Sequence, residues 1–180
     1  ERTSLRNFPL CSTCRGEYAN PRDRRFHAQA ICCPDCGPQV EAWTREGQLL
    51  ARKDAALGLA AQAVRDGKIL ALKGLGGFHL VVDARNAEAV AELRRRKSRE
   101  AKPFAVMMPE GDLGGTVSEE ERRLLRSSEG PIVLLRWTQG SLIAPNVAPG
   151  NPCLGVFLPT TPLHALLISD LKFPVVATSG

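Results

Sequence analysis

Short apolar runs alternate with amphipathic segments from about residue 48 to the end of the chain. The apolar runs predict β-strands at 48–52, 69–73, 78–83, 103–108, 131–137, 154–158 and 173–178. The amphipathic segments predict helices at 54–65, 86–97, 118–126 and 161–169. Strands and helices that alternate through short links favour an α/β or α+β domain, in which helices flank a twisted sheet.

Capping residues mark where two of these helices begin. Ser118 followed by Glu121 is the pattern of a capping box. Thr161 followed by Pro162 supplies a cap and a proline suited to the first turn. Between two of the predicted strands, the stretch at 141–152 is rich in Pro, Gly and Asn and predicts a loop.

The first 46 residues differ from the rest of the chain. They contain five of the six cysteines, no lysine and little apolar periodicity. A segment of this size buries too little apolar surface to fold without an additional cross-link, such as a bound metal or disulfides. We therefore expect a small module at 1–46 and a larger domain at 47–180.

The cysteines of the small module have the spacing of metal ligands. Two C-x2-C pairs, separated by eighteen residues, direct four thiolates toward one centre. The predicted ligands of a structural Zn²⁺ are Cys11, Cys14, Cys33 and Cys36. A redox-active dithiol and disulfides are the alternatives. Four cysteine ligands leave no open position for zinc catalysis.

The other thiols and one histidine are interpreted as bystanders. Cys32 adjoins a ligand and should point away from the metal, and His27 would become a ligand only if a cysteine were spared. Cys153 is more often a packed thiol than a nucleophile. Clustered C-x2-C pairs without a secretion signal favour a reducing compartment.

Composition excludes several classes of protein. The chain has 180 residues, 43% of them hydrophobic, and no apolar run approaches the ~18 residues of a membrane span. Its first ten residues are polar and do not form a signal peptide, so we expect an internal segment of a longer protein. The net charge of +5 permits an anionic partner without requiring one.

A glycine-rich turn follows the strand predicted at 69–73. Lys73 is succeeded by Gly74, Leu75, Gly76 and Gly77. Such a turn brings backbone N–H groups close to an anion, and the lysine adds positive charge. The pattern is neither a P-loop nor GxGxxG, and a plain tight hairpin is an equal interpretation.

A second group of cations runs from Arg94 to Lys102. We interpret Arg94 and Arg95 as solvated residues near a helix end, where positive charge is favourable. Lys97, Arg99 and Lys102 lie where the chain enters the next strand. Loops at strand ends are where α/β sheets bind ligands.

The polar turn of Thr178 and Ser179 exposes backbone groups in the same way. The sequence shows neither a pair of catalytic carboxylates nor a Ser–His–Asp arrangement. This favours a site that works by positioning and charge neutralisation, with Lys73, Lys97 and Arg99 converging on one cleft.

Two histidines, His79 and His164, are the candidate acid–base groups. His79 lies in a predicted strand and His164 in a leucine-rich helix. Histidines in such positions are more often packed or hydrogen-bonded than reactive, and a binding role is the alternative interpretation.

These motifs together resemble one family. The runs KGLGGFHLVVDA, LRRRKSREAKPFAVMM, LPTTPLHALL and ATSG, in this order, are similar to the YrdC-like domain of the HypF family of hydrogenase-maturation carbamoyltransferases. The cysteine pairs, with the Gly37-Pro38 that follows them, resemble the second zinc module of that family. The resemblance covers residues 9–180.

The resemblance implies a fold, a chemistry and partners. The fold is a YrdC-like twisted sheet preceded by a small, zinc-ribbon-like module with four cysteine ligands. The enzyme is cytoplasmic and multidomain, and it forms carbamoyl-adenylate from carbamoyl phosphate and ATP, with Mg²⁺ as an additional counter-ion. The carbamoyl group passes to the C-terminal cysteine of a partner, HypE, as the precursor of the cyanide ligands of a nickel–iron centre.

The resemblance also assigns a binding site by motif position. The residues that it places against ATP or carbamate are Lys73, Gly76, Gly77, Lys97, Arg99, Lys102, His164, Thr178 and Ser179. Three of the cations, Lys73, Lys97 and Arg99, are expected to carry the catalysis. Because the family's other domains have no counterpart in the sequence, we expect the chain to be a fragment.

Double-stranded RNA or tRNA binding is the alternative function. The basic charge, the zinc module and the RNA affinity proposed for YrdC proteins favour it. Aromatic residues make up only 5% of the chain, so platforms for base stacking are scarce.

Overall fold

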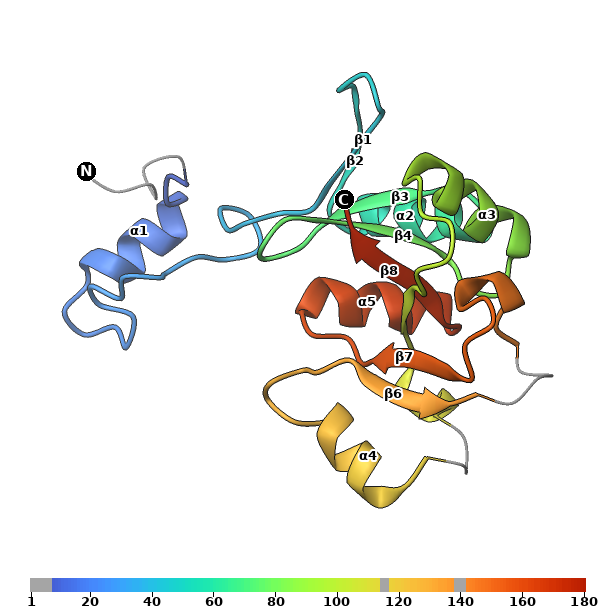
Figure 1. The fold of residues 1–180 in the computed structure, drawn as a ribbon. Helices are drawn as coiled ribbons and strands as arrows, with labels where there is room; N and C mark the ends of the chain where they lie inside the picture. The colour runs from blue at the N-terminus through green and yellow to red at the C-terminus, as the bar shows by residue number, and fades with distance from the viewer. Residues whose placement is uncertain (1–7, 114–116, 138–141) are drawn as a thin grey trace. The chain divides into compact units, whose positions relative to one another are not determined.

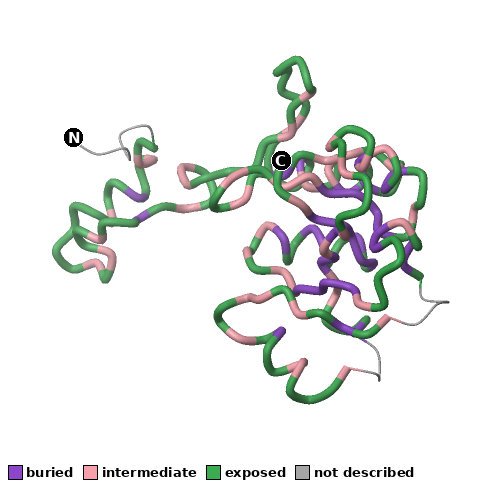
Figure 2. Tube along the Cα trace, viewed as in Figure 1, coloured by how far each residue is buried: buried purple, intermediate pink, exposed green. Residues whose placement is uncertain are grey.

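The computed structural model describes residues 8–113, 117–137 and 142–180. Two compact units divide the chain between Ala56 and Leu57. The tube in Figure 2 shows a continuous buried framework within the second unit, whereas buried residues are sparse in the first.

The first unit has little regular secondary structure. Its helix α1 (Ser12–Ala19) begins directly after Cys11, whose sulfur accepts a hydrogen bond from the backbone N–H of Cys14 (3.5 Å). Two short strands, β1 (Glu41–Trp43) and β2 (Leu49–Arg52), pair in antiparallel orientation. The sequence patterns predict neither α1 nor β1. Neither segment has an apolar period of its own: a cysteine cap begins the helix, and pairing with β2 creates the strand.

The second unit is a mixed sheet with helices on both faces (Figure 1). Its strands are β3 (Leu70–Lys73), β4 (Phe78–Asp83), β5 (Ala105–Met107), β6 (Val133–Arg136), β7 (Cys153–Phe157) and β8 (Val175–Ser179). They lie in the order β3–β4–β8–β5–β7–β6, with β5 and β7 parallel. The helices are α2 (Lys53–Arg65), α3 (Ala87–Arg96), α4 (Glu119–Leu125) and α5 (Pro162–Leu171).

Two hydrophobic cores lie on opposite sides of this sheet. Val64 of α2 and Leu167 of α5 share one core with Val81 of β4. Leu93 of α3 belongs to the other core, together with Val82 of β4. Val81 and Val82 are both fully buried although they are adjacent, because successive strand residues point to opposite faces. The alternation in β4 therefore serves both cores.

The predicted mixed fold is confirmed, and each predicted strand and helix of 48–178 lies within two residues of an observed one. Among the described residues the structure adds the 3₁₀ turns η2 (Glu110–Asp112) and η3 (Pro145–Val147), and η3 lies inside the predicted loop. Residue 141, the first of that loop, lies outside the described residues. Within the described part of the chain, no helix combines the length and apolarity needed to cross a membrane.

The capping box of α4 makes a stability prediction. The Ser118 hydroxyl accepts a hydrogen bond from the Glu121 N–H (3.2 Å), and the Glu121 carboxylate accepts one from the Ser118 N–H (2.7 Å). Ser118→Ala should therefore lower the free energy of unfolding by about 1 kcal/mol in a urea titration. Ser169→Ala, at an exposed position of α5, is the control and should change it by less than about 0.5 kcal/mol. Equal losses from both variants would contradict this account.

Candidate functional site

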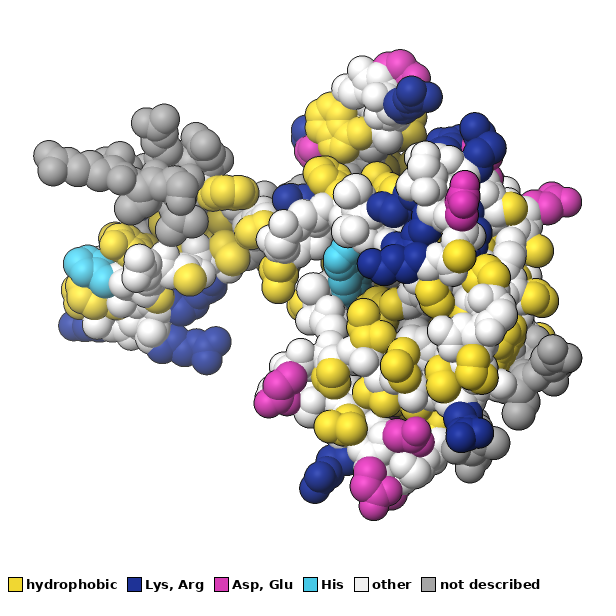
Figure 3. Space-filling model, viewed as in Figure 1, with side chains coloured by type: hydrophobic (Ala, Val, Ile, Leu, Met, Phe, Trp, Pro, Cys, Tyr) yellow, Lys and Arg dark blue, Asp and Glu magenta, His cyan; other side chains and the backbone are white. Residues whose placement is uncertain are grey.

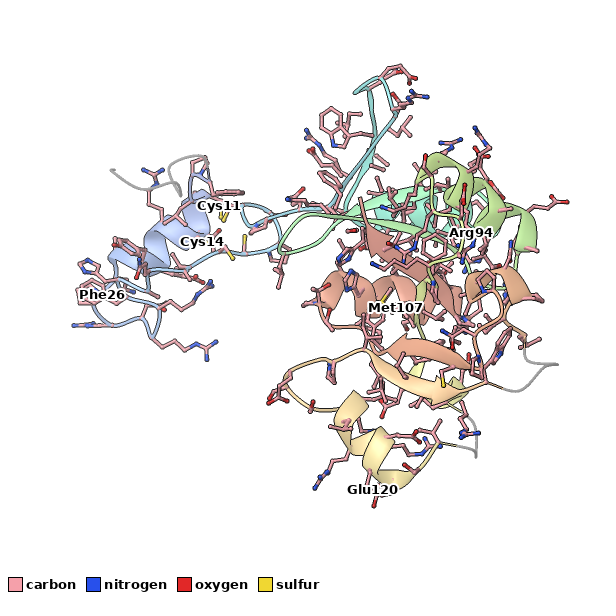
Figure 4. All side chains as sticks on the ribbon, viewed as in Figure 1. Cys11, Cys14, Phe26, Arg94, Met107 and Glu120 are labelled. Atoms are coloured by element: carbon pink, nitrogen blue, oxygen red, sulfur yellow. The ribbon has the colours of Figure 1, made fainter. Side chains whose placement is uncertain are left out.

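The four cysteines predicted as zinc ligands gather in the first unit. The sulfur atoms of Cys11, Cys14, Cys33 and Cys36 all lie within 4.8 Å of one another. The Cys11–Cys33 and Cys33–Cys36 sulfurs are 3.7 and 3.9 Å apart. A tetrahedral zinc with Zn–S bonds of ~2.3 Å spaces its sulfurs by about 3.8 Å, so the cluster has the dimensions of a four-thiolate zinc site. Figure 4 shows sulfur atoms gathered beside the labelled Cys11 and Cys14.

Backbone groups shape the second knuckle of this cluster. The Asp35 N–H donates to the Cys33 sulfur (3.4 Å), and the Gly37 N–H donates to the Cys33 carbonyl (2.8 Å). A Cβ atom at Gly37 would lie 2.9 Å from that carbonyl oxygen, so the turn requires glycine. Backbone hydrogen bonds lower the pKa of the Cys36 thiol to about 6, whereas burial raises the pKa of Cys14. A bound cation would stabilise the buried sulfur as a thiolate.

In the second unit, strand pairing brings three predicted site segments to one end of the sheet. Lys73 at the end of β3 pairs with Phe78, and the next residue, His79, pairs with Ser179 at the end of β8. Two strand spacings of ~4.8 Å separate the β3 and β8 backbones by about 10 Å. The Lys73 ammonium lies over the Phe78 ring, 5.2 Å from its centroid.

The glycine-rich turn between β3 and β4 is closed by a single backbone contact. The Gly74 N–H donates to the Gly77 carbonyl (2.7 Å). A Cβ atom added at Gly76 or Gly77 would meet nothing within 4 Å, so both backbones border open space. Leu75 at the tip is 92% exposed. The turn is accordingly accessible to a ligand at its glycines.

Lys97 and Arg99 reach the same end of the sheet from the connection between α3 and β5. The Lys97 ammonium donates to the Ser179 carbonyl. The Arg99 guanidinium lies 3.5 Å from the Thr178 hydroxyl and 4.6 Å from the centroid of the Phe104 ring. The structure thus brings Lys97, Arg99, Thr178 and Ser179 together, and it places Lys73 two strands away at the same sheet end.

Two of the three guanidinium nitrogens of Arg99 already donate to backbone carbonyls of the protein. Its Nε donates to the Lys102 carbonyl (3.0 Å), and one of its terminal nitrogens donates to the Pro103 carbonyl. Lys102 itself is exposed. Arg99 therefore fixes the loop on which these cations stand and adds positive charge to it.

The interpretation of Arg94 as a solvated residue is wrong. Its guanidinium donates to carbonyl oxygens of Asn146 (2.6 Å), Val147 (3.0 Å), Arg99 (3.0 Å), Glu100 (3.3 Å) and Lys102 (3.2 Å). Each of these acceptors lies beyond the helix that carries Arg94. The helix-face argument could not foresee partners that only the tertiary fold supplies.

Arg95 behaves as the sequence predicts. It is exposed and pairs with Glu92 on its own helix (2.8 Å). Arg96 shares the same carboxylate (2.6 Å). Hydrogen bonds from Arg95 and then Arg96 lower the pKa of Glu92 to about 2.

The two histidines of this unit contact each other. His79 Nδ1 lies 3.3 Å from His164 Nε2, and the rings stack with centroids 5.2 Å apart. His164 is only 1% exposed, whereas His79 is half-buried and lies against Gly74 of the glycine turn. Its Nδ1 lies 3.4 Å from the Thr160 hydroxyl. Burial, and then His79, lower the pKa of His164.

A cavity of about 730 Å³ lies between η2, α4 and α5. Its lining includes Arg126, Thr160 and Lys172, and none of the residues predicted to bind ATP or carbamate. Arg126 is paired with Glu110 at the rim (2.5 Å). The sequence reasoning did not find this cavity, because its walls come from four segments without a shared motif.

The fold and the site define the class of protein. Residues 62–180 match the family model Sua5/YciO/YrdC, described as telomere recombination, and the chain belongs to that family. Residues 10–42 match the model described as the HypF finger. The finger match and the four-cysteine cluster together indicate a zinc site.

The closer relatives are HypF carbamoyltransferases. The chain is 51% identical to carbamoyltransferase HypF of Rhodobacter capsulatus, over 99% of this chain and 24% of that protein. It is 50% identical to that of Synechocystis, over 98% of this chain and 30% of that protein. The chain therefore spans about a quarter to a third of the length of these relatives.

Solved structures show the same relationship. Full-length HypF in its phosphate- and nucleotide-bound form is 46% identical, with a TM-score of 0.76 over 99% of this chain and 23% of that one. HypF from T. kodakarensis is 41% identical, with a TM-score of 0.80 over 96% of this chain and 23% of that one. Sua5 from P. abyssi, at 19% identity and a TM-score of 0.61, shares the fold.

The zinc site makes the second prediction. Cys33→Ser should lose bound zinc and disorder residues 9–38, because ligation contributes on the order of 10 kcal/mol to the folding of small zinc modules. Atomic emission and amide hydrogen exchange would measure the two effects. Cys32→Ser, at an exposed thiol outside the cluster, is the matched control and should retain one zinc per chain. The unit after Ala56 should keep its unfolding transition in chelator, since it has its own cores. Zinc retained by Cys33→Ser would exclude the assigned ligand set.

The Arg94 contacts make the third prediction. Arg94→Ala should lower the free energy of unfolding by about 3 kcal/mol, because several carbonyls lose a charged donor. Arg95→Ala, one position along the same helix, should leave the free energy of unfolding nearly unchanged, since its ion pair is exposed. Denaturant titration of both variants measures the difference. A similar loss of unfolding free energy in both variants would mean that other groups donate to these carbonyls when Arg94 is absent.

Proposed function

We propose that the unit formed by residues 57–180 binds ATP and carbamate at the shared end of β3, β4 and β8 and joins them into carbamoyl-adenylate. The observation that carries this proposal is that two cations of the α3–β5 connection contact the end of β8. Lys97 donates to the Ser179 carbonyl, and the Arg99 guanidinium lies beside the Thr178 hydroxyl. The open glycine turn lies at the same sheet end. Two findings support it: relatives are named as HypF carbamoyltransferases, and a similar full-length HypF was crystallised in a phosphate- and nucleotide-bound form.

The proposed reaction needs charge neutralisation more than proton transfer. A carbamate oxygen attacks the α-phosphorus of ATP, the bond from that phosphorus to the bridging oxygen breaks, and pyrophosphate leaves with the electron pair. Carbamate is already ionised, so no general base is required. Negative charge grows on the leaving oxygens, where Lys97 and Arg99, with Lys73 and Lys102, supply positive charge. Mg²⁺ bound to ATP would share this role.

The remaining steps are assigned to the longer protein of which such a chain forms part. Carbamoyl phosphate would be the source of the carbamate. The carbamoyl group would pass to the C-terminal cysteine of HypE, in the cytoplasm, for cyanide-ligand synthesis in hydrogenase maturation. The zinc unit would serve as a scaffold, because four cysteine ligands leave no position for a substrate.

The test of this proposal compares two cations on the same segment. Lys97→Ala should lower carbamate-dependent exchange of pyrophosphate into ATP by about tenfold or more, equivalent to about 1.4 kcal/mol of transition-state stabilisation. Arg95→Ala removes the same charge from the solvated face and should leave the exchange rate within about twofold. Equal losses would favour a diffuse basic surface that binds RNA, and salt-sensitive RNA binding would then be measured directly.

Arg99→Lys separates charge from geometry at the neighbouring position. A lysine keeps the positive charge, but its single nitrogen cannot reproduce the planar fork in which two separate nitrogens of Arg99 donate to the Lys102 and Pro103 carbonyls. We expect the exchange rate to fall by about tenfold or more, together with a lower melting temperature. Exchange at the wild-type rate in this variant would show that the loop does not depend on the arginine fork.

A further inference from the structure

We propose that His79 is the side chain that donates a neutral hydrogen bond to the anionic ligand of the candidate site, and that His164 and Thr160 fix its tautomer and orientation. This inference rests on the proposed function. His79 is then a ligand-binding residue, and His164 and Thr160 are positioning residues. The sequence analysis leaves a binding role open for both histidines, and the family resemblance assigns one to His164, whose side chain is only 1% exposed.

The placement of His79 supports a contact with the ligand. It is the second residue of β4, directly after Phe78 and the glycine turn, and it pairs with Ser179, whose carbonyl accepts from Lys97. Its ring packs beneath the turn: a Cβ atom at Gly74 would lie 3.3 Å from the His79 Cε1. His79 is only half-buried. In the space-filling view, histidine atoms lie next to lysine and arginine atoms on the surface of this unit (Figure 3).

The contacts beneath His79 form a continuous chain. The Thr160 hydroxyl lies 3.4 Å from His164 Nδ1, and His164 Nε2 lies 3.3 Å from His79 Nδ1. The backbone of His164 is held as well, since its N–H donates to the hydroxyl of Thr161, the cap of α5 (3.1 Å). Gly130 packs against the Thr160 methyl group, because a Cβ atom there would lie 2.9 Å from it. Contacts with glycine backbone therefore hold both ends of this series, Gly130 against Thr160 and Gly74 against His79.

The hydrogen bonds that link Thr160, His164 and His79 can all point in either of two directions. The charge of the ligand selects one of them. In the first, Thr160 donates to His164 Nδ1, His164 Nε2–H donates to His79 Nδ1, and His79 Nε2–H points outward as a donor. In the reverse direction, His79 presents a lone pair to the site, which would repel an anion. Both directions leave the two imidazoles neutral and their contacting nitrogens satisfied. An anionic ligand therefore favours the Nε2–H tautomer of both residues.

Burial also favours a neutral ring at His164, because desolvation disfavours the charged imidazole. His79 lies at the sheet end that carries the cations Lys73 and Lys97. His164 of α5 contacts His79, and the uncharged Thr160, just before the cap of that helix, contacts His164. A neutral donor adds a hydrogen bond for a phosphate or carbamate oxygen without adding to the repulsion among the cations.

Nitrogen-15 NMR of imidazole-labelled protein tests the tautomers directly. The chain has three histidines, and His27 in the other unit serves as an internal reference. We expect His79 and His164 to carry their protons on Nε2 at pH 7. Addition of ATP should shift the His79 signal and leave that of His27 unchanged. A proton on His79 Nδ1, or a His79 signal insensitive to ATP, would overturn the inference.

A matched pair of variants separates positioning from packing. His164→Gln keeps an amide donor near the position of Nε2, whereas His164→Leu fills the space without a donor. We expect His164→Leu to mix the His79 tautomers and to lower carbamate-dependent exchange by about tenfold, and His164→Gln to remain within about threefold. Thr160→Val should reproduce part of the effect and Thr160→Ser should not. If the Gln and Leu variants lose exchange activity equally and the His79 tautomer does not change, His164 serves only in packing.

The two proposals fail in different ways. If the wild-type chain shows no carbamate-dependent exchange but ATP still shifts His79, the proposed reaction is wrong and the ligand contact stands. If exchange occurs while His79 neither shifts with ATP nor changes in His164→Leu, the reaction stands and the histidine chain has no part in it.

Discussion

Antiparallel pairing between β4 and β8 is the interaction on which the second unit depends. It joins an early strand to the last one, so it is a non-local contact whose loop-closure entropy must be offset by burial. The pair offsets this cost on both faces: Val81 and Ala177 belong to one core, and Val82 and Val176 to the other. The same register sets His79 opposite Ser179. The candidate site is thus a consequence of the pairing that also closes the hydrophobic cores.

Arg94 supplies the second constraint, because it fixes the connection that carries Lys97 and Arg99. Its guanidinium and that of Arg99 both lie over the Phe104 ring, with centroid distances of 4.7 and 4.6 Å. Burial, and then the charge of Arg99, lower the pKa of Arg94. Two neighbouring cations would repel each other in this environment, and the carbonyl oxygens around them offset that repulsion. The loop is therefore held in shape before any ligand arrives.

The sequence predicts this molecule well wherever the signal is local. Cysteine spacing, the apolar run at 78–83 and the capping box of Ser118 each lie within one short segment, and the structure has the predicted feature at all three. Arg94 shows where local reasoning fails, since its acceptors at Asn146 and Val147 come from a distant turn. Local reasoning also could not predict the contact of His164 with His79, because that contact depends on how α5 packs on β4. The helix α1 begins directly after its cap, Cys11, without an apolar pattern, so no periodicity could predict it.

The candidate site holds several positive charges close together. The two cations that contact β8, Lys97 and Arg99, differ in how many of their donors the protein already uses. Arg99 donates from Nε and from one terminal nitrogen to carbonyl oxygens of its own loop, so its geometry is fixed by the protein. Lys97 gives one hydrogen bond to the Ser179 carbonyl, and an ammonium group has three donors. Lys97 can therefore bind a phosphate oxygen without giving up its anchor, and charge-assisted bonds to phosphate are stronger than those to a neutral carbonyl. This division makes Arg99 the residue that positions the cationic loop, and Lys97 the residue whose further donors can follow negative charge as it develops on the ligand.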